Sequence, residues 1–512
     1  MTAYKNENNR QPVRLAAALT GVWTAFGFAT AQADVQFNPR VGADLTWTDN
    51  VDLAPPGQPK QDDLIARLTP GVRVLYDNRR MNVYLDYQLQ ALAFKNDGDK
   101  DEVFDQGQFG LQLAAIDNWL YLDASAQRSQ TAVDPAQPSN VQNLFQVGNV
   151  ADSTSAQATP ILKHDFRFAQ LEASYTRGFV DYVKTSKTTV VNDLSLDDSR
   201  NRNTTAALRS ADPDDLVTWG ATYRRDQVDY DLAETFKYER MVGELGILVS
   251  PHLRLLANGG AESDSRQDTS KGGLNSSLWE VGFEWHDGQL SELRLLAGKR
   301  FFGTTVDGSW RYTGRIMEAD VSYREAPTTQ TQNTVLKSFV GPGIFPPGLD
   351  TQLSRTTADV YLLKQLAGDI GLRGRLTEIF LGVTSERRYY YTAPTGTDRY
   401  DGVNIQASRR LGPELRIEVR AAFDDAHLRD ATDFQDRNFS VSLSRLLGRA
   451  TSLVLSANHY ERTGATSGYT ANWVMLGFNM TFGPQNARAG NGGMHALPGT
   501  TGFPTVPSGQ MR

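Results

Sequence analysis

Apolar side chains occupy every second position in segment after segment of this chain, with polar side chains between them. Met81–Ala93 is the clearest case: its odd positions are apolar, while Asn82, Asp86, Gln88 and Gln90 stand between them. Successive side chains of a β-strand point to opposite faces. Each such segment is therefore predicted to be a strand with one apolar and one polar face.

Comparable segments recur almost to the end of the chain. Most are about 9 to 14 residues long, the length with which a tilted strand crosses a bilayer. After residue 30, no segment has the roughly 18 consecutive apolar residues expected of a transmembrane helix. The other alternating segments begin at Leu64, Phe109, Val217, Leu245, Trp279, Leu293, Val403, Leu415, Phe439, Leu453 and Val474.

The connections separate a membrane barrel from a soluble sandwich or propeller, whose strands also alternate. Short links occur at Asp77–Arg80, Ile116–Asn118, Asp212–Asp215, Ser250–His252, His286–Gln289, Gly412–Glu414 and Gly448–Ala450. Longer, polar links lie between them at Thr48–Gln61, Lys95–Phe104, Arg128–Asp152, Gly178–Asn201, Glu262–Asn275 and Asp424–Asp436. Strict alternation of short and long links is typical of an up-and-down barrel with one periplasmic rim. The predicted fold is all-β, a single up-and-down antiparallel transmembrane β-barrel. Its strand number is even and about 16 to 22, with Trp310–Ile379 leaving the number open.

Both chain ends differ from the alternating region. Lys5, Arg10 and Arg14 precede an apolar run, and Ala31-Gln-Ala33 supplies the small residues that a signal peptidase accepts. The run is too short for the alternative, a membrane anchor. We predict a signal peptide at residues 1–33, the barrel at 34–482, and a flexible tail rich in glycine and proline at 483–512.

The last alternating segment, Trp473–Phe482, resembles the C-terminal recognition signal of outer-membrane barrels. The resemblance rests on Gly477, Phe478, Met480 and the terminal aromatic Phe482. It implies the barrel-insertion machinery as a partner. The alternative is a last strand with no special role, and either interpretation ends the barrel at Phe482.

Composition excludes several kinds of site. The chain has no cysteine and a net charge of −7, so thiolate chemistry and nucleic-acid binding are not expected. Asp424-Asp425-Ala-His427 contains a carboxylate and a histidine that could activate water, but a hydrated acidic loop is the preferred interpretation. Asp97–Asp101 resembles a calcium loop, yet Glu102 stands where glycine is required. We predict no catalytic residue, no metal, no cofactor and no enzymatic activity.

The polar positions of the strands are predicted to line the lumen. They are Asp86, Gln88, Glu280, Glu284, Arg294, Arg416, Glu418 and Arg420. Their mixed signs predict a weakly selective aqueous channel. The apolar segment Phe339–Leu349 is predicted to fold inward as a constriction or to cover a rim. Arg387–Tyr391 and Arg300–Phe302 combine cations with aromatics, which is typical of sugar-binding tracks and also of the aromatic girdles at membrane interfaces.

A family resemblance is found in the first hairpin. "TDNVDLAP" at Thr48–Pro55, Asp62-Asp63 and "LTPGVRV" at Leu68–Val74 resemble the uncharacterised outer-membrane family associated with PEP-CTERM/exosortase systems. The resemblance extends over Val35–Phe482. It implies a Gram-negative outer membrane and a cell that produces exopolysaccharide, but no established activity.

Two functions follow as expectations. The first is a porin-like channel or an export accessory linked to exopolysaccharide and PEP-CTERM systems. The alternative is a non-conducting structural or interaction barrel of the cell envelope, and a surface hydrolase ranks third. The expected location is the cell outer membrane. The expected partners are outer-membrane lipid and lipopolysaccharide, with polysaccharide as a further candidate and no nucleic acid.

Overall fold

The chain forms one sheet of 22 strands. The computed structural model describes residues 34–134, 136–138, 144–145, 148–184, 196–264, 276–288, 290–329, 332, 360–390, 396–429, 432–464 and 468–482. The strands are β1 (Asp34–Thr48), β2 (Asp63–Asp77), β3 (Met81–Phe94), β4 (Glu102–Ile116), β5 (Leu120–Ala132), β6 (Val150–Asp165), β7 (Ala169–Lys184), β8 (Ser199–Ser210), β9 (Val217–Tyr230), β10 (Phe236–Ser250), β11 (Leu253–Asp264), β12 (Ser276–Asp287), β13 (Ser291–Arg300), β14 (Gly303–Thr313), β15 (Met317–Thr329), β16 (Val360–Arg373), β17 (Thr377–Tyr390), β18 (Thr397–Arg410), β19 (Leu415–His427), β20 (Phe434–Leu446), β21 (Thr451–Gly464) and β22 (Tyr469–Thr481). A 3-10 turn, η1 (Gly98–Lys100), lies between β3 and β4.

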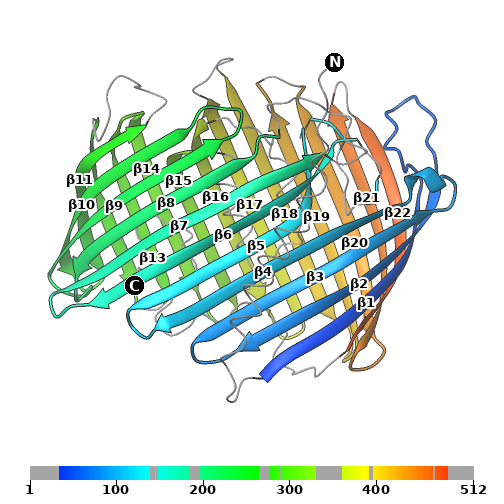
Figure 1. Cartoon of the computed structure of the whole chain (residues 1–512), viewed down its shortest axis with the longest axis horizontal. Coiled ribbons are helices and arrows are strands. Elements are labelled where there is room, and N and C mark those ends of the chain that lie inside the picture. Colours follow the sequence, from blue (N-terminus) through cyan, green and yellow to red (C-terminus); the bar gives the residue numbers. More distant parts are fainter. Residues whose placement is uncertain are drawn as a thin grey trace, which may run out of the picture.

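The sheet closes on itself as an antiparallel barrel (Figure 1). Every strand pairs with its neighbours in sequence, and β1 pairs with β22, where Trp47 lies opposite Val474. At the end of this seam the backbone N–H of Phe482 donates to the carbonyl oxygen of Pro39 at 2.7 Å. Closure satisfies both sheet edges, which lipid cannot do. The predicted fold class is confirmed, with the strand number at the upper end of the expected range.

The outer and inner faces of the wall differ in polarity, as the sequence period predicts. On β12, Trp279 and Val281 are 53% and 51% exposed, whereas Glu280 between them is 4% exposed. The outer face thus presents an apolar band, and the interior face, opposite to it, carries polar side chains. The fold and this band are those of an outer-membrane β-barrel. No helix in the described ranges is long and apolar enough to span a membrane.

The two rims carry different connections. The turn rim consists of the links that follow even-numbered strands: 78–80, 117–119, 166–168, 211–216, 251–252, 288–290, 314–316, 374–376, 411–414 and 447–450. The loop rim consists of the links that follow odd-numbered strands, among them 49–62, 95–101 and 133–149. The prediction of strict alternation is wrong at several places on the loop rim: the links 231–235 and 465–468 are shorter than the turn-rim link 211–216, and Phe301-Phe302 is a two-residue turn. Gly303 beside it has φ +118°, a conformation that glycine adopts without strain.

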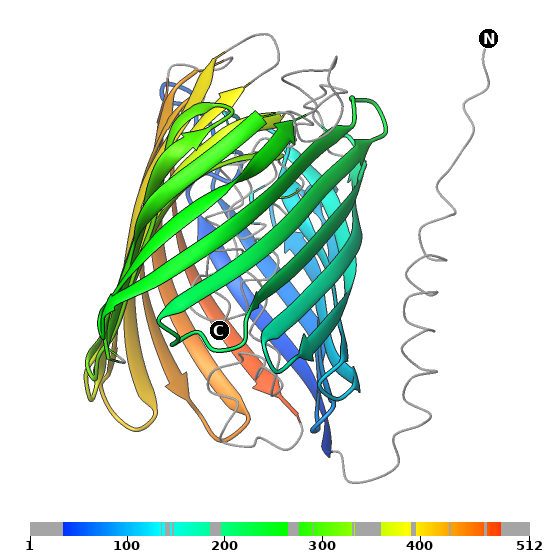
Figure 2. The same cartoon turned by 90° about the vertical axis from the view of Figure 1, so that its left-hand side faces the viewer.

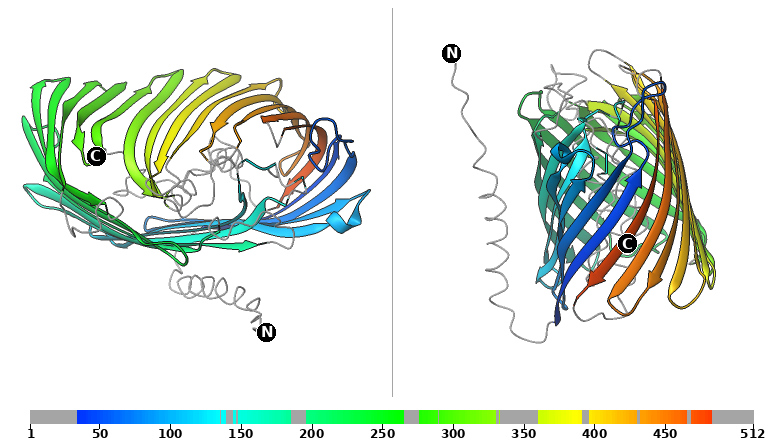
Figure 3. Two further views of the ribbon diagram at one scale, coloured as in Figure 1. Left: turned by 90° about the horizontal axis from the view of Figure 1, so that it is seen from above. Right: turned by 90° about the vertical axis from the view of Figure 1, so that its right-hand side faces the viewer.

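The barrel is flattened in cross-section (Figure 3). The seam between β1 and β22 lies toward one narrow end, and the steeply tilted strands around β11 to β13 turn the other end (Figure 2). Gly260, Gly282 and Gly298 lie on the interior face there, and a Cβ at each would overlap the backbone of an adjacent strand. Glycine at these positions therefore permits the close approach that a sharply curved wall requires.

Three sequence-based expectations lie outside the described residues. They are the signal peptide at residues 1–33, the inward segment Phe339–Leu349 and the tail at 483–512. The first described strand begins at Asp34, the residue that follows the predicted cleavage site. These expectations remain predictions.

Candidate functional site: the polar interior of the barrel

The residues predicted to line the lumen lie on four strands, β3, β12, β13 and β19. Strand alternation places each of them on the interior face. The register brings several together: Glu284 lies directly opposite Arg294 on one side and Arg254 on the other. Whether these side chains border a continuous water path remains a prediction.

Asp86 is the centre of an ion-pair cluster on β1, β2 and β3. Its carboxylate accepts hydrogen bonds from Arg40 and from Arg73, the latter at 2.8 Å. The Tyr84 hydroxyl donates to the same carboxylate at 3.2 Å. Gln88, two residues along, accepts a second hydrogen bond from Arg40 at 2.8 Å. Two of the predicted lumen residues are thus joined through one guanidinium group, and the negative charge of Asp86 is compensated.

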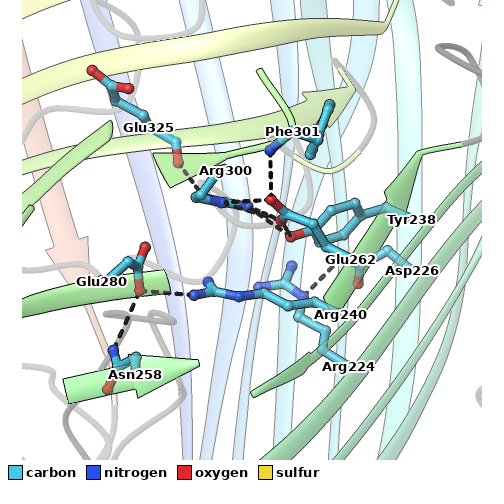
Figure 4. Close-up of polar contacts among 10 residues, drawn as sticks. All are labelled: Arg224, Asp226, Tyr238, Arg240, Asn258, Glu262, Glu280, Arg300, Phe301 and Glu325. Atoms are coloured by element: carbon cyan, nitrogen blue, oxygen red, sulfur yellow. Dashed lines mark hydrogen bonds and ion pairs between the residues drawn. The ribbon is translucent and has the colours of Figure 1, made fainter. Parts of the chain in front are cut away.

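A second cluster spans β9 to β12 (Figure 4). Arg240 on β10 pairs with Glu280 on β12 at 3.0 Å, and the Asn258 side chain between them donates to the same carboxylate at 3.3 Å. On β9, Arg224 pairs with Asp226 at 2.7 Å. Each carboxylate of this cluster is thus paired with an arginine on the same wall of the barrel.

Above this cluster, near the loop rim, Arg300 is almost completely buried (Figure 4). Its guanidinium donates to Glu262 at 2.8 Å, to the Tyr238 hydroxyl at 2.7 Å and to the backbone carbonyl of Glu325 at 2.9 Å. The backbone N–H of Phe301 donates to Glu262 at 3.0 Å. Because every charged atom has a partner, this pair can be held out of water.

The same arrangement of a buried arginine, a carboxylate and aromatic rings recurs twice along the loop rim. Arg388 pairs with Glu386 on β17, and Arg462 on β21 pairs with Asp436 on β20. Each guanidinium also lies over aromatic rings, a favourable cation–π contact. The rings are Tyr361 and Tyr400 for Arg388, and Phe434 and Tyr469 for Arg462. These groups are inaccessible to a solute, so they stabilise the wall of the mouth.

Part of the 133–149 link folds over the interior face at the seam. Arg462 donates to the backbone carbonyl of Gln137 at 2.7 Å. Phe145 meets Trp473 edge-on, with ring centroids 5.4 Å apart, and Leu144 is buried beside it. This contact joins a loop after β5 to the last strand of the barrel. It narrows the mouth along β1 and β22.

The 49–62 link contributes to the same apolar cluster through Val51 and Leu53. Asn50 anchors it by donating from its side chain to the carbonyl of Thr470 at 3.0 Å. Asp52 of the same link forms an ion pair with Lys100 in η1 at 2.6 Å. Burial alone would lower the pKa of Lys100, but the hydrogen bond and charge of Asp52 outweigh burial and raise the pKa above its ordinary value.

Sequence reasoning missed this inward packing. Among the described residues, the segments that pack inward come from the 49–62 and 133–149 links, for which no inward packing was predicted. A signal was available: Leu144-Phe145 is an apolar pair within a polar link. Pattern alone could not show where that pair would insert.

On the turn-rim half of the interior, the predicted residues of β19 form ion pairs. Arg416 donates to Ser408 at 2.6 Å and pairs with Glu378 at 3.3 Å. Glu418 pairs with Arg420 at 2.5 Å. These side chains are partly exposed, so they are accessible to water and ions.

In the other candidate motifs, neighbouring residues point to opposite faces of the sheet. Asp425 and His427 share the outer face at 3.2 Å, but Asp424 lies on the interior face, so the three do not converge. Arg388 and Tyr390 point inward, whereas Arg387 and Tyr389 point outward. The described ranges contain no group of three or more metal-ligating side chains.

Comparison with known proteins gives structural similarity only. No protein family matches the sequence. No curated protein matches it either. The FrpB iron transporter from Neisseria meningitidis (F5-1 variant) is 11% identical, with 88% of this chain and 83% of that chain covered and a TM-score of 0.47. The siderophore receptor PirA from Pseudomonas aeruginosa is 8% identical, with 88% and 82% covered and a TM-score of 0.44. A BenF-like porin from Pseudomonas fluorescens Pf-5 is 9% identical, with 88% and 99% covered and a TM-score of 0.36.

Proposed function

We propose that this barrel is an outer-membrane channel that conducts small hydrophilic solutes with weak ion selectivity. The observation that supports it is the charge pairing of the interior face. Asp86, Glu280 and Glu418 each have a guanidinium partner on the same wall. Paired charges of both signs produce no strong field of one sign that would exclude cations or anions.

Planar-bilayer recording tests this proposal. The folded protein is expected to conduct in a tenfold potassium chloride gradient. Its reversal potential should be much smaller in magnitude than the roughly 59 mV of an ideally selective pore. Asp86→Asn should shift the reversal potential toward anion selectivity, because Arg40 and Arg73 lose their counter-charge. Glu239→Gln is the matched control, since Glu239 pairs with Arg225 on the outer face and its loss should leave selectivity unchanged.

The alternative is a structural barrel that does not conduct. The observation that favours it is the packing of the 49–62 and 133–149 links against the seam, which covers part of the mouth. Replacing residues 136–148 by a glycine-serine linker separates the two. A channel should gain conductance on this replacement, whereas a structural barrel should stay silent before and after it.

We further propose that the protein serves an envelope that secretes exopolysaccharide and sorts PEP-CTERM proteins, as a channel or an export accessory. The resemblance of Thr48–Pro55 and Leu68–Val74 to the associated outer-membrane family supports this context. Deleting the gene should lower the amount of exopolysaccharide retained at the cell surface, measured as total carbohydrate of washed cells. Complementation with the full chain is the control, and unchanged carbohydrate in the deletion strain would argue against the link.

A further inference from the structure

A cluster of arginines lies on the outer face of β7, β8 and β9. Its members are Arg177, Arg200, Arg202 and Arg225, all exposed. They share this face with Tyr175 and Phe179, which are 43% and 36% exposed. We name the four arginines the arginine patch.

The patch lies at the upper boundary of the apolar band. On β9 the outward residues from the turn rim are Val217, Trp219, Ala221 and Tyr223, followed by Arg225. Eight residues of a strand tilted by about 40° rise roughly 21 Å, close to the about 25 Å height of a hydrocarbon band. The guanidinium groups therefore lie at the level of the lipid headgroups on the loop-rim side.

The patch carries more positive than negative charge. Arg177 lies directly opposite Arg202, and like charges in this arrangement repel each other. Arg202 pairs with Asp229 at 3.0 Å and Arg225 with Glu239 at 3.2 Å, whereas Arg177 and Arg200 form no ion pair with a carboxylate among the described residues. On the neighbouring wall, by contrast, Arg128 pairs with Asp105 at 2.7 Å and with Asp152 at 3.3 Å.

We infer that the arginine patch binds the phosphate groups of an outer-leaflet glycolipid, the lipid A part of lipopolysaccharide. Guanidinium groups bind phosphate in a bidentate manner, and a bound phosphate would relieve the repulsion between Arg177 and Arg202. Tyr175 and Phe179 provide apolar surface at the junction of headgroup and acyl chains. This inference depends on the outer-membrane location and not on conduction, so the two proposals fail independently.

Native mass spectrometry of the folded full-length barrel in detergent, titrated with bisphosphorylated lipid A, tests the inference. The double variant R177Q/R202Q should bind lipid A at least about tenfold more weakly than the wild type. Arg437→Gln is the matched control, because Arg437 is exposed on the outer face of β20 beside Glu461 and should not change binding. A heat-modifiable gel band confirms that each variant is folded.

Dephosphorylated lipid A should bind the wild type weakly, and inorganic phosphate at equal concentration should not displace lipid A. Equal binding of lipid A to the wild type and R177Q/R202Q would overturn the inference. Equal binding of the dephosphorylated lipid would also overturn it, because phosphate would then not be the recognised group. Displacement by inorganic phosphate at equal concentration would overturn it too, because the patch would then be a general phosphate site and not a lipid A site.

Discussion

The Arg462→Ala substitution is expected to lower the free energy of unfolding by about 3–5 kcal/mol, the usual effect of breaking a buried ion pair. The Arg462 side chain is 0% exposed and makes two contacts of 2.6 Å with Asp436. Its removal leaves that carboxylate buried without a cation. The carbonyl of Gln137 loses its shorter hydrogen bond at the same time and keeps only the 3.4 Å one from Asn149, which loosens the inward part of the 133–149 link.

Urea titration of the folded barrel in micelles, followed by tryptophan fluorescence, measures this difference. Arg437→Ala is the control on the adjacent strand. The Arg437 side chain is 53% exposed and lies 3.5 Å from Glu461, so this substitution should lower the free energy of unfolding by at most about 1 kcal/mol. The double variant R462A/D436A should be more stable than R462A alone, because no unpaired charge remains. Equal losses for R462A and Arg437→Ala would contradict the role assigned to the buried pair.

Phe482→Asp is expected to abolish assembly of the barrel. Phe482 is 45% exposed on the outer face, directly after the closing strand, and its backbone N–H bonds to Pro39 across the seam. A carboxylate would face lipid where the sheet closes, and the aromatic end of the proposed recognition signal would be lost. The readout is the heat-modifiable gel band of membrane fractions, which should disappear.

Two variants separate the effect of the aromatic from that of the chain end. Phe482→Tyr keeps an aromatic ring at the membrane interface and should retain the band. Deleting residues 483–512 should retain it as well, because the predicted barrel is complete at Phe482. A Phe482→Asp protein that keeps a wild-type band would show that this position is not part of an assembly signal.

Local pattern was enough to predict the strands. In Met81–Ala93 the period of two follows from the geometry of an extended chain, and β3 covers this segment. The same rule placed Asp86 and Gln88 on the interior face without knowledge of their neighbours. Trp310–Ile379, whose mixed parity left the strand number open, contains parts of β14 to β17, separated by the long 330–359 link.

The partners of the interior charges could not be predicted in this way. Arg40 contacts Asp86 from β1, two strands away in the sheet, and this contact depends on the register of two hairpins. A shift of one residue in either hairpin would turn the side chains to the other face. Sequence spacing does not contain this information.

Alternation and link length were sufficient to predict a closed barrel with an apolar outer face, because both are local properties of the chain that a lipid environment requires. The construction of the mouth depends instead on contacts between segments far apart in the sequence. Arg462 meets Gln137, and Phe145 meets Trp473, across more than 300 positions of the sequence. Such contacts exist only after β22 has paired with β1, since that pairing brings the last strand beside the loops of the first ones.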